Sequence, residues 1–207
     1  MTNLLRAARR KLSPGWNDEW PRLTEKATRC RTVQLGCGRG TAPLQGVVNV
    51  DINPATHPNV LCDLNGKRFP FRDNTFDMVV AISVLEHLND FVAAMEEIHR
   101  ITRPGASVHI LVPHFSSAAA FVDPTHRQLL SARACDYFIA KTTIERDYGF
   151  YRPYRFSMKK RYVELAGIWN RLPPLRWLAE NRTAFWEEYL CFLIRGAGVY
   201  WELEVVK

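Results

Sequence analysis

Short apolar runs separated by polar or glycine-containing segments occupy much of the first half of the chain. The runs, each four to six residues long and typical of buried strands, lie at 32–35, 47–50, 60–63, 78–82 and 107–112. Between the last two runs, apolar residues recur at helical spacing over 91–101, which predicts a helix that extends through Thr102 and is capped by Asn89 or Asp90. Strands that alternate with helical segments in this way predict an α/β fold.

The second half of the chain has a different pattern. Residues 155–163 and 199–205 alternate apolar and polar positions, which predicts two half-buried strands. Aromatic and aliphatic residues at helical spacing predict a helix between them at 184–195, and a further helical stretch is predicted at 128–140. We expect the proline-containing segment 172–177 to be an inserted loop.

One segment combines a strand, a glycine-rich turn, a second strand and an acid. Gly36, Gly38 and Gly40 follow the first strand at alternate positions, so the backbone can adopt positive φ and approach a ligand closely. Asp51 ends the second run, where a carboxylate can accept both hydroxyl hydrogen bonds of a ribose. Only residues 41–46 separate turn and strand, which predicts a shortened crossover without the helix N-terminus that a pyrophosphate needs. The pattern predicts a site for a nucleoside without phosphates.

At these residues the chain resembles the class I S-adenosylmethionine-dependent methyltransferases of the small, stand-alone, type 11-like kind. The resemblance rests on VQLGCGRG (33–40), VVNVDI (47–52), CDLN (62–65), FPFRDNTFDMVV (69–80), SVLEHL (83–88) and RPGASVHILVP (103–113). It implies a doubly wound, seven-stranded and mostly parallel sheet with a reversed last strand, which is the Rossmann-like methyltransferase fold. It also implies S-adenosylmethionine as the cofactor and S-adenosylhomocysteine as its product.

The resemblance further implies which residues hold the cofactor. They are Gln34, Gly36, Cys37, Gly38, Asp51, Ile52, Asp63, Leu64, Ala81, Ile82 and Ser83. Asp63 would accept a hydrogen bond from the adenine amino group. Gln34 departs from the family pattern, because members often carry an acid there that orients the methionine ammonium group. Gln34 would therefore serve as a neutral acceptor, or the contact would come from elsewhere.

A polar segment follows the fifth strand, at the sheet edge where open α/β sheets bind ligands. We expect residues 113–150 to form an insertion on the acceptor side of the site. His126 and His114 are predicted bases for the acceptor, with Asp123 orienting one of them, and His87 is a further candidate. Structural roles have equal weight: Asp123 would cap the following helix, His126 would pack in its first turn, and His87 would pack or make a hydrogen bond.

His114, Asp123 and His126 could also be metal ligands, which is a more specific hypothesis than a set of polar substrate contacts. Their irregular spacing, with no second carboxylate nearby, disfavours it. We therefore predict no metal.

Length and composition narrow the remaining choices. A chain of 207 residues predicts a single domain over 1–207, with residues 1–31 as an N-terminal helical extension. Leu4, Leu5, Ala8 and Leu12 share one helical face of that extension, which favours a packing helix over a membrane-surface helix or a lid. Five cysteines without ligand spacing predict reduced thiols in a cytoplasmic protein.

The net charge of +7 favours an acidic partner, such as nucleic acid, an anionic membrane surface or a phosphorylated substrate. Aromatic and arginine side chains interleave over 145–162 and suit stacking on RNA bases, on sugars, or over the site itself. The leading prediction is methyl transfer to oxygen or nitrogen of a polar small molecule or glycan. The alternatives are an RNA methyltransferase and a non-catalytic nucleoside-binding or scaffold protein, and the oligomeric state stays open.

Overall fold

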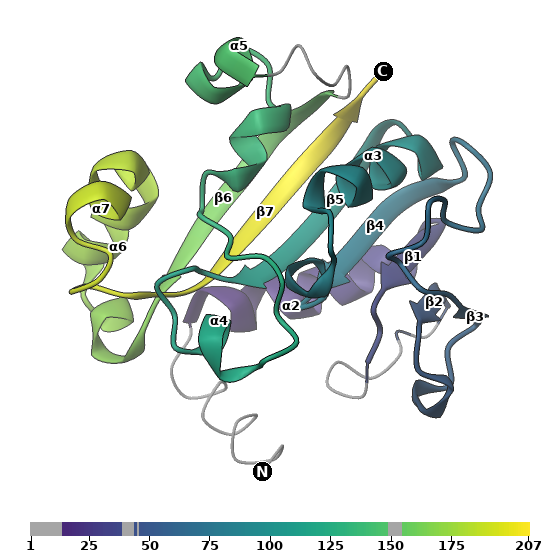
Figure 1. Cartoon of the computed structure of the whole chain (residues 1–207), viewed down its shortest axis with the longest axis horizontal. Helices are drawn as coiled ribbons and strands as arrows, with labels where there is room; N and C mark the ends of the chain where they lie inside the picture. The colour runs from purple at the N-terminus through teal and green to yellow at the C-terminus, as the bar shows by residue number, and fades with distance from the viewer. Residues whose placement is uncertain (1–13, 39–43, 45, 149–154) are drawn as a thin grey trace.

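The computed structural model describes residues 14–38, 44, 46–148 and 155–207, and Figure 1 shows their arrangement. The apolar helical face expected at 4–12 lies outside the described residues. So do most of the residues expected to form the shortened first crossover, and residues 149–154 of the aromatic segment.

Seven strands form one central sheet. They are β1 (Thr32–Leu35), β2 (Val48–Asp51), β3 (Val60–Leu61), β4 (Phe76–Ile82), β5 (Thr102–Pro113), β6 (Arg155–Leu165) and β7 (Gly196–Val206). Their order across the sheet is β3-β2-β1-β4-β5-β7-β6. Strand β7 is antiparallel to β5 and β6, while the pairs from β3 to β5 are parallel. The predicted mostly parallel sheet with a reversed last strand is confirmed.

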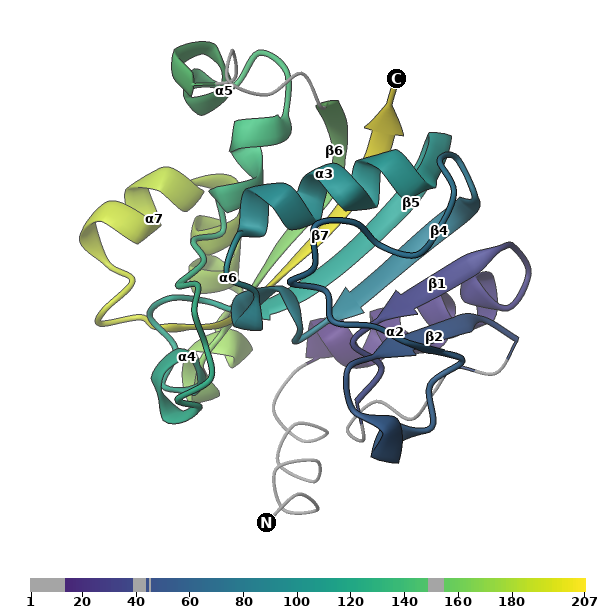
Figure 2. The same ribbon diagram turned by 45° about the vertical axis from the view of Figure 1, so that its right-hand side comes forward.

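The sheet is buried on both faces, as a doubly wound fold requires. Residues 78–82 of β4 point alternately to the two faces, and all are 5% exposed or less. Those on one face pack with Leu23 of α2 (Pro14–Ala27), and those on the other pack in a larger cluster with Met95 of α3 (Phe91–Ile101). Figure 2 shows α2 and α3 on opposite sides of the sheet.

Helix α3 lies where its apolar periodicity predicts it. The Asp90 side chain accepts a hydrogen bond from the Ala93 N–H at 2.9 Å, which caps the first turn. The helix ends at Ile101, and β5 begins at the next residue, five residues before the strand that the sequence predicted. Strand and helix are therefore joined without a loop.

The C-terminal strands agree with prediction, but the helices between them do not. The segment 172–177, expected to be a loop, instead opens helix α6 (Pro173–Asn181), because proline is accommodated in a first helical turn. Helix α7 (Thr183–Tyr189) is shorter than the predicted 184–195.

The helix predicted at 128–140 is wrong. The region contains only a 3₁₀ turn over 134–138, between α4 (Ala119–Val122) and α5 (Thr143–Tyr148). Its backbone groups bond to other parts of the chain: the Leu130 C=O accepts from the Phe115 N–H, and the Ala132 C=O accepts from the indole N–H of Trp201. These tertiary bonds replace the local ones of a helix.

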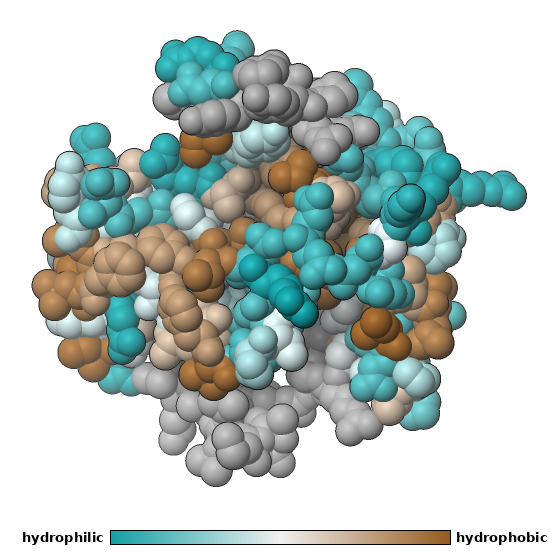
Figure 3. Space-filling view, in the orientation of Figure 1, coloured by the Kyte–Doolittle hydropathy of each residue, from teal (hydrophilic) through white to brown (hydrophobic). Residues whose placement is uncertain are grey.

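Apolar side chains also gather on the surface. Figure 3 shows them over α4 and α7, on the face drawn in Figure 1. The exposed ones in these two regions are Phe121, Val122, Phe185, Tyr189, Phe192 and Leu193. Within the described ranges, no helix has the length and apolarity needed to cross a membrane.

Candidate functional site

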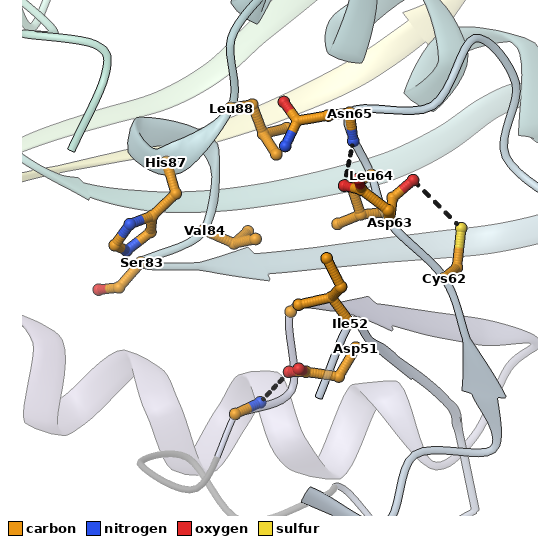
Figure 4. Close-up of a pocket in the computed structure, with 12 residues that line it drawn as sticks. Asp51, Ile52, Cys62, Asp63, Leu64, Asn65, Ser83, Val84, His87 and Leu88 are labelled. Carbon is orange, nitrogen blue, oxygen red and sulfur yellow. Dashed lines mark hydrogen bonds between the residues drawn. The ribbon is translucent and has the colours of Figure 1, made fainter. Parts of the chain in front are cut away.

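A cleft of about 240 Å³ opens at the carboxyl ends of β1, β2 and β4. Figure 4 shows its lining residues, which come from the segments at the ends of β1, β2, β3 and β4. The lining residues are Gly36, Gly38, Asp51, Ile52, Cys62, Asp63, Leu64, Asn65, Ser83, Val84, His87 and Leu88. Seven of the predicted cofactor residues are among them: Gly36, Gly38, Asp51, Ile52, Asp63, Leu64 and Ser83.

The glycine turn after β1 requires its glycines. Gly36 has φ +60° and Gly38 has φ +49°, in the left-handed region that favours glycine. A Cβ on Gly36 would lie 2.4 Å from Cγ2 of Val84, so the turn packs directly against the segment after β4. The backbone of Cys37 between them is fixed by its N–H, which donates to the Val50 C=O at 3.0 Å. The turn is thus held from both neighbouring strands.

Asp51 ties the glycine turn to the end of β2. Its Oδ2 accepts from the Gly38 N–H at 2.7 Å, and its Oδ1 accepts from the Asn53 N–H at 2.8 Å (Figure 4 shows the Gly38 bond). A carboxylate offers about four lone-pair positions, so each oxygen keeps capacity for one more donor. Asp51 can therefore organise the turn and still accept two ligand hydroxyl groups.

The far end of the cleft combines apolar faces with a polar edge. Ile52 and Leu64 approach from one side in Figure 4, and Leu88 from the other. Asp63 lies at the margin, where its Oδ1 accepts from the Asn65 N–H at 2.9 Å. This arrangement suits a flat ring between aliphatic side chains with a hydrogen-bonding group at its edge.

Four predicted cofactor residues do not line the cleft. Gln34 is fully buried, and its Oε1 accepts from the Leu44 N–H at 3.1 Å. Cys37 is fully buried with its Sγ 3.7 Å from Thr56 Oγ1. Ala81 and Ile82 are the last two residues of β4, and their side chains are buried in the core. The prediction missed Cys62, Asn65, Val84 and Leu88, whose apolar or amide character carries no sequence signal for a ligand.

His87 is the predicted catalytic residue that reaches the cleft. Its Nδ1 lies 2.9 Å from Thr125 Oγ1, and that hydroxyl donates to Asp123 Oδ1 at 2.6 Å. Asp123 is thus linked to His87 through Thr125, whereas the sequence predicted that it would orient His126 or His114. Burial, and then the nearby His126, lower the pKa of His87, so its imidazole is neutral at pH 7. The same Thr125 hydrogen bonds lower the pKa of Asp123.

His126 lies beside His87, with ring centroids 4.6 Å apart. Its Nδ1 is 3.0 Å from the Ala120 C=O, and its Nε2 is 4.0 Å from Oε1 of the buried Glu86. No helix follows Asp123, which instead closes a turn by accepting from the Thr125 N–H. The expected helix cap at Asp123 is therefore wrong, while His126 and His87 do come together.

His114 does not reach the cleft, and this corrects its prediction as a base for the acceptor. The side chain is fully buried at the end of β5. Its Nδ1 accepts from the Ser116 N–H at 3.2 Å, and its Nε2 lies 3.1 Å from Glu187 Oε1. With both ring nitrogens engaged inside the core, His114 fastens β5 to α7.

Glu187 is the centre of that internal contact. Its carboxylate accepts from Ser131 Oγ at 2.8 Å and from the Ala132 N–H at 2.7 Å, besides its contact with His114. Burial raises the pKa of Glu187, but these hydrogen bonds outweigh burial and leave the pKa lowered.

Comparison with known proteins relates this geometry to a family. Residues 33–110 match a family model described as a methyltransferase domain. Norajmaline N-methyltransferase from Rauvolfia serpentina is 24% identical over 169 residues, which are 79% of this chain and 53% of that protein. Demethylmenaquinone methyltransferase from Mycobacterium marinum is 30% identical over 122 residues, 51% of this chain and 52% of that protein. The chain thus spans about half the length of these two relatives.

Solved structures show the same fold at low sequence identity. A SAM-dependent methyltransferase from Archaeoglobus fulgidus has a TM-score of 0.57 and 17% identity, covering 99% of this chain and 94% of its own. The cyclase SpnF has a TM-score of 0.56 and 14% identity, covering 91% of this chain and 80% of its own. Because one of these two is named a cyclase, the fold by itself does not fix the reaction.

Proposed function

The chain belongs to the class I S-adenosylmethionine-dependent methyltransferases, and on this premise we propose that it transfers a methyl group to oxygen or nitrogen of a small-molecule acceptor. The observation that carries the proposal is Asp51, at the carboxyl end of β2, with both oxygens anchored by backbone N–H groups and exposed to the cleft. A carboxylate fixed in this way is suited to the two hydroxyl groups of a ribose.

The rest of the cleft fits the other parts of S-adenosylmethionine. Ile52, Leu64 and Leu88 would enclose the adenine ring, with Asp63 as acceptor for its amino group. The glycine turn and Ser83 would lie along the methionine portion, where the missing Cβ atoms allow close approach. Gln34 supports the turn through Leu44, so the ammonium group would be held by other atoms of the turn.

S-adenosylmethionine, when bound, supplies a sulfonium methyl group that an oxygen or nitrogen nucleophile can attack. The protein would contribute by aligning the acceptor with that methyl group and by excluding water. Because His87 lines the cleft next to Ser83 and Val84, it marks the side from which the acceptor would approach.

The surroundings of that side favour an acceptor with an apolar framework around its reacting group. The sequence predicted a polar small molecule or glycan. Phe121 and Val122 of α4 are 65% and 78% exposed, and α4 immediately precedes the turn that carries His126. Exposed apolar side chains beside a cleft are suited to binding apolar surface. The same consideration makes a glycan less favoured.

RNA is less favoured as the acceptor. In the described part of 145–162, Arg155 pairs with Glu145 at 2.9 Å, and Arg161 pairs with Asp136. Phe156 is buried in the core. Arginines paired with acids and aromatics packed in a core are not available to stack on bases.

Calorimetry with S-adenosylhomocysteine and S-adenosylmethionine tests the proposal first. We expect both to bind with one-to-one stoichiometry, followed by transfer of labelled methyl from the cofactor in a screen of hydroxyl- and amine-bearing metabolites. Absence of cofactor binding would refute the enzyme proposal. Binding without transfer to any metabolite class would favour the non-catalytic alternative.

We also propose that residues 1–207 form one domain, as the sequence predicts. The contacts between β5 and β7, and between β5 and α7 through His114, support this proposal. Limited proteolysis is expected to leave no stable fragment that ends near residue 115, and such a fragment would contradict the proposal.

A further inference from the structure

We propose that Glu86, His87 and His126 bind a divalent transition-metal cation at the acceptor side of the cleft, where it would hold the acceptor's hydroxyl group. The sequence predicted no metal and disfavoured a site on His114, Asp123 and His126; the set proposed here shares only His126 with that one. This inference rests on the proposed methyl transfer for its role, but not for its test.

Three donor side chains converge from two separate segments. Glu86 and His87 are consecutive in the turn after β4, and His126 comes from the turn after α4. One ligand atom from each lies within 4.8 Å of the other two. Zinc ligands lie about 2.0–2.2 Å from the metal, and their donor atoms are therefore about 3–4 Å apart. A side-chain adjustment of about 1 Å would close the site.

The hydrogen bonds of His126 fix the tautomer that a metal requires. Its Nδ1 faces the Ala120 C=O at 3.0 Å, and a carbonyl oxygen can only accept. Nδ1 therefore carries a proton, and Nε2, which lies 4.0 Å from Glu86 Oε1, is the ring nitrogen left for a metal.

His87 is fixed in the same way through Thr125. The single hydroxyl proton of Thr125 is donated to Asp123 at 2.6 Å, so its oxygen must accept from His87 Nδ1 at 2.9 Å. Nδ1 again carries the proton, which leaves the Nε2 lone pair for another partner. Histidines that ligate metals commonly donate their other N–H to a carbonyl or carboxylate in this manner.

The carboxylate completes a set that suits a catalytic metal. Glu86 has a side chain that is 2% exposed, and a cation beside it would offset the cost of burying its charge. Two imidazoles and one carboxylate are a known ligand set of zinc sites that keep a further position open.

The position of the set suggests what the open coordination position would bind. His87 lines the cofactor cleft, and the exposed Phe121 and Val122 lie on the helix before His126. An alcohol or phenol on an apolar framework would place its oxygen on the metal and its framework against α4. A metal bound there would lower the pKa of the hydroxyl, whose proton would pass to solvent. The oxygen would then use a lone pair to form the O–C bond while the methyl C–S bond breaks and its electron pair goes to sulfur.

Titration of the untagged, metal-free full chain with Co²⁺, followed by visible absorption and calorimetry, tests the site without cofactor or acceptor. We expect saturation at one equivalent with no thiolate charge-transfer band. His126→Asn and Glu86→Gln should each weaken Co²⁺ at least tenfold while remaining folded by circular dichroism. The matched control is His57→Asn, an exposed histidine in another turn at positive φ, which asparagine tolerates. It should leave Co²⁺ affinity unchanged.

Thr125→Val gives a second measurement if either ligand variant fails to fold. It removes the hydroxyl that accepts from His87 and donates to Asp123, and it leaves all three ligand side chains in place. It should weaken Co²⁺ about tenfold. Wild-type protein that does not saturate at one equivalent, or folded variants with unaltered affinity, would overturn the site. Binding of S-adenosylhomocysteine to the metal-free protein is measured in parallel. If it binds and Co²⁺ does not, the metal site alone is refuted; the opposite result would refute the proposed function alone.

Discussion

Replacing Asp51 is expected to weaken the cofactor far more than it weakens the fold. Each hydrogen bond to a charged acceptor contributes about 1.5 kcal/mol or more, so loss of two ribose contacts costs about 3 kcal/mol. At about 1.4 kcal/mol per factor of ten, the Kd for S-adenosylhomocysteine should rise roughly 150-fold in Asp51→Ala. The Kd of Asp51→Asn should lie between those of the wild type and Asp51→Ala, because the amide keeps one acceptor oxygen.

Calorimetry with S-adenosylhomocysteine measures the change, at a temperature where circular dichroism shows each variant folded. Asp73→Asn is the matched control for Asp51→Asn. It makes the same chemical change at an exposed aspartate outside the cleft, which forms ion pairs with Arg68 and Arg100. Its affinity should equal that of the wild type.

A second ligand separates loss of ribose contacts from distortion of the glycine turn, which Asp51 also anchors through Gly38. The 2′,3′-dideoxy analogue of S-adenosylhomocysteine should bind wild-type protein much more weakly than the parent, yet bind Asp51→Ala about as well as the parent does. Parent binding within threefold of wild type in Asp51→Ala would refute the reasoning. If the analogue binds more weakly than the parent by the same factor in both proteins, Asp51 acts only by organising the turn.

Three further predictions concern stability, each measured by urea unfolding. Gly36→Ala should cost about 2–4 kcal/mol, because it combines positive φ with a contact of 2.4 Å to Val84, and a loss under 1 kcal/mol would contradict this. Burial lowers the pKa of His109 to about 3 in the folded protein, against about 6.5 in the unfolded chain. The stabilisation that the neutral imidazole gives the folded state is therefore complete above about pH 6.5 and is lost as the pH falls toward about 3. His109→Gln should therefore flatten the decline between pH 6.5 and 4, by up to about 1.4 kcal/mol per pH unit, whereas parallel curves would count against it. Glu187→Ala should destabilise by about 3 kcal/mol, since it leaves the Nε2 of His114, the Ser131 hydroxyl and the Ala132 N–H without their acceptor. Glu188→Ala, on the exposed face of the same helix, is the control, and an equal effect would disprove the contact.

The sheet was predictable because each buried parallel strand is a short run of almost continuous apolar residues, a pattern typical of strands covered on both faces. Residues 78–82 are apolar at every position since both faces of β4 are covered, and 155–163 alternate since β6 is at the sheet edge. Helix α3 followed from its periodicity and the cap at Asp90. The helix prediction at 128–140 was wrong because backbone groups of this segment bond to distant residues such as Phe115. Hydrophobic periodicity carries no information about such long-range hydrogen bonds.

The cofactor side of the site was predictable for a related reason. Gly36, Gly38 and Asp51 are required by backbone geometry and by a carboxylate at a strand end, both of which are visible in local sequence. Val84 and Leu88 line the cleft only because the turn after β4 folds over it. Whether an aliphatic side chain lines a cleft depends on tertiary packing, and the local sequence around it does not indicate this.

The two histidines of the 113–127 segment show why the acceptor side could not be assigned from sequence. His114 and His126 have similar polar neighbours along the chain, and each was an equally good candidate base. Their roles diverge through partners that lie elsewhere: Glu187 is 73 positions from His114 and draws its ring into the core. His126 instead meets His87, because the turn that carries Thr125 docks on the residues after β4. A histidine's chemistry is set by which atom its Nδ1 bonds and what its Nε2 then faces, and tertiary contacts decide both here.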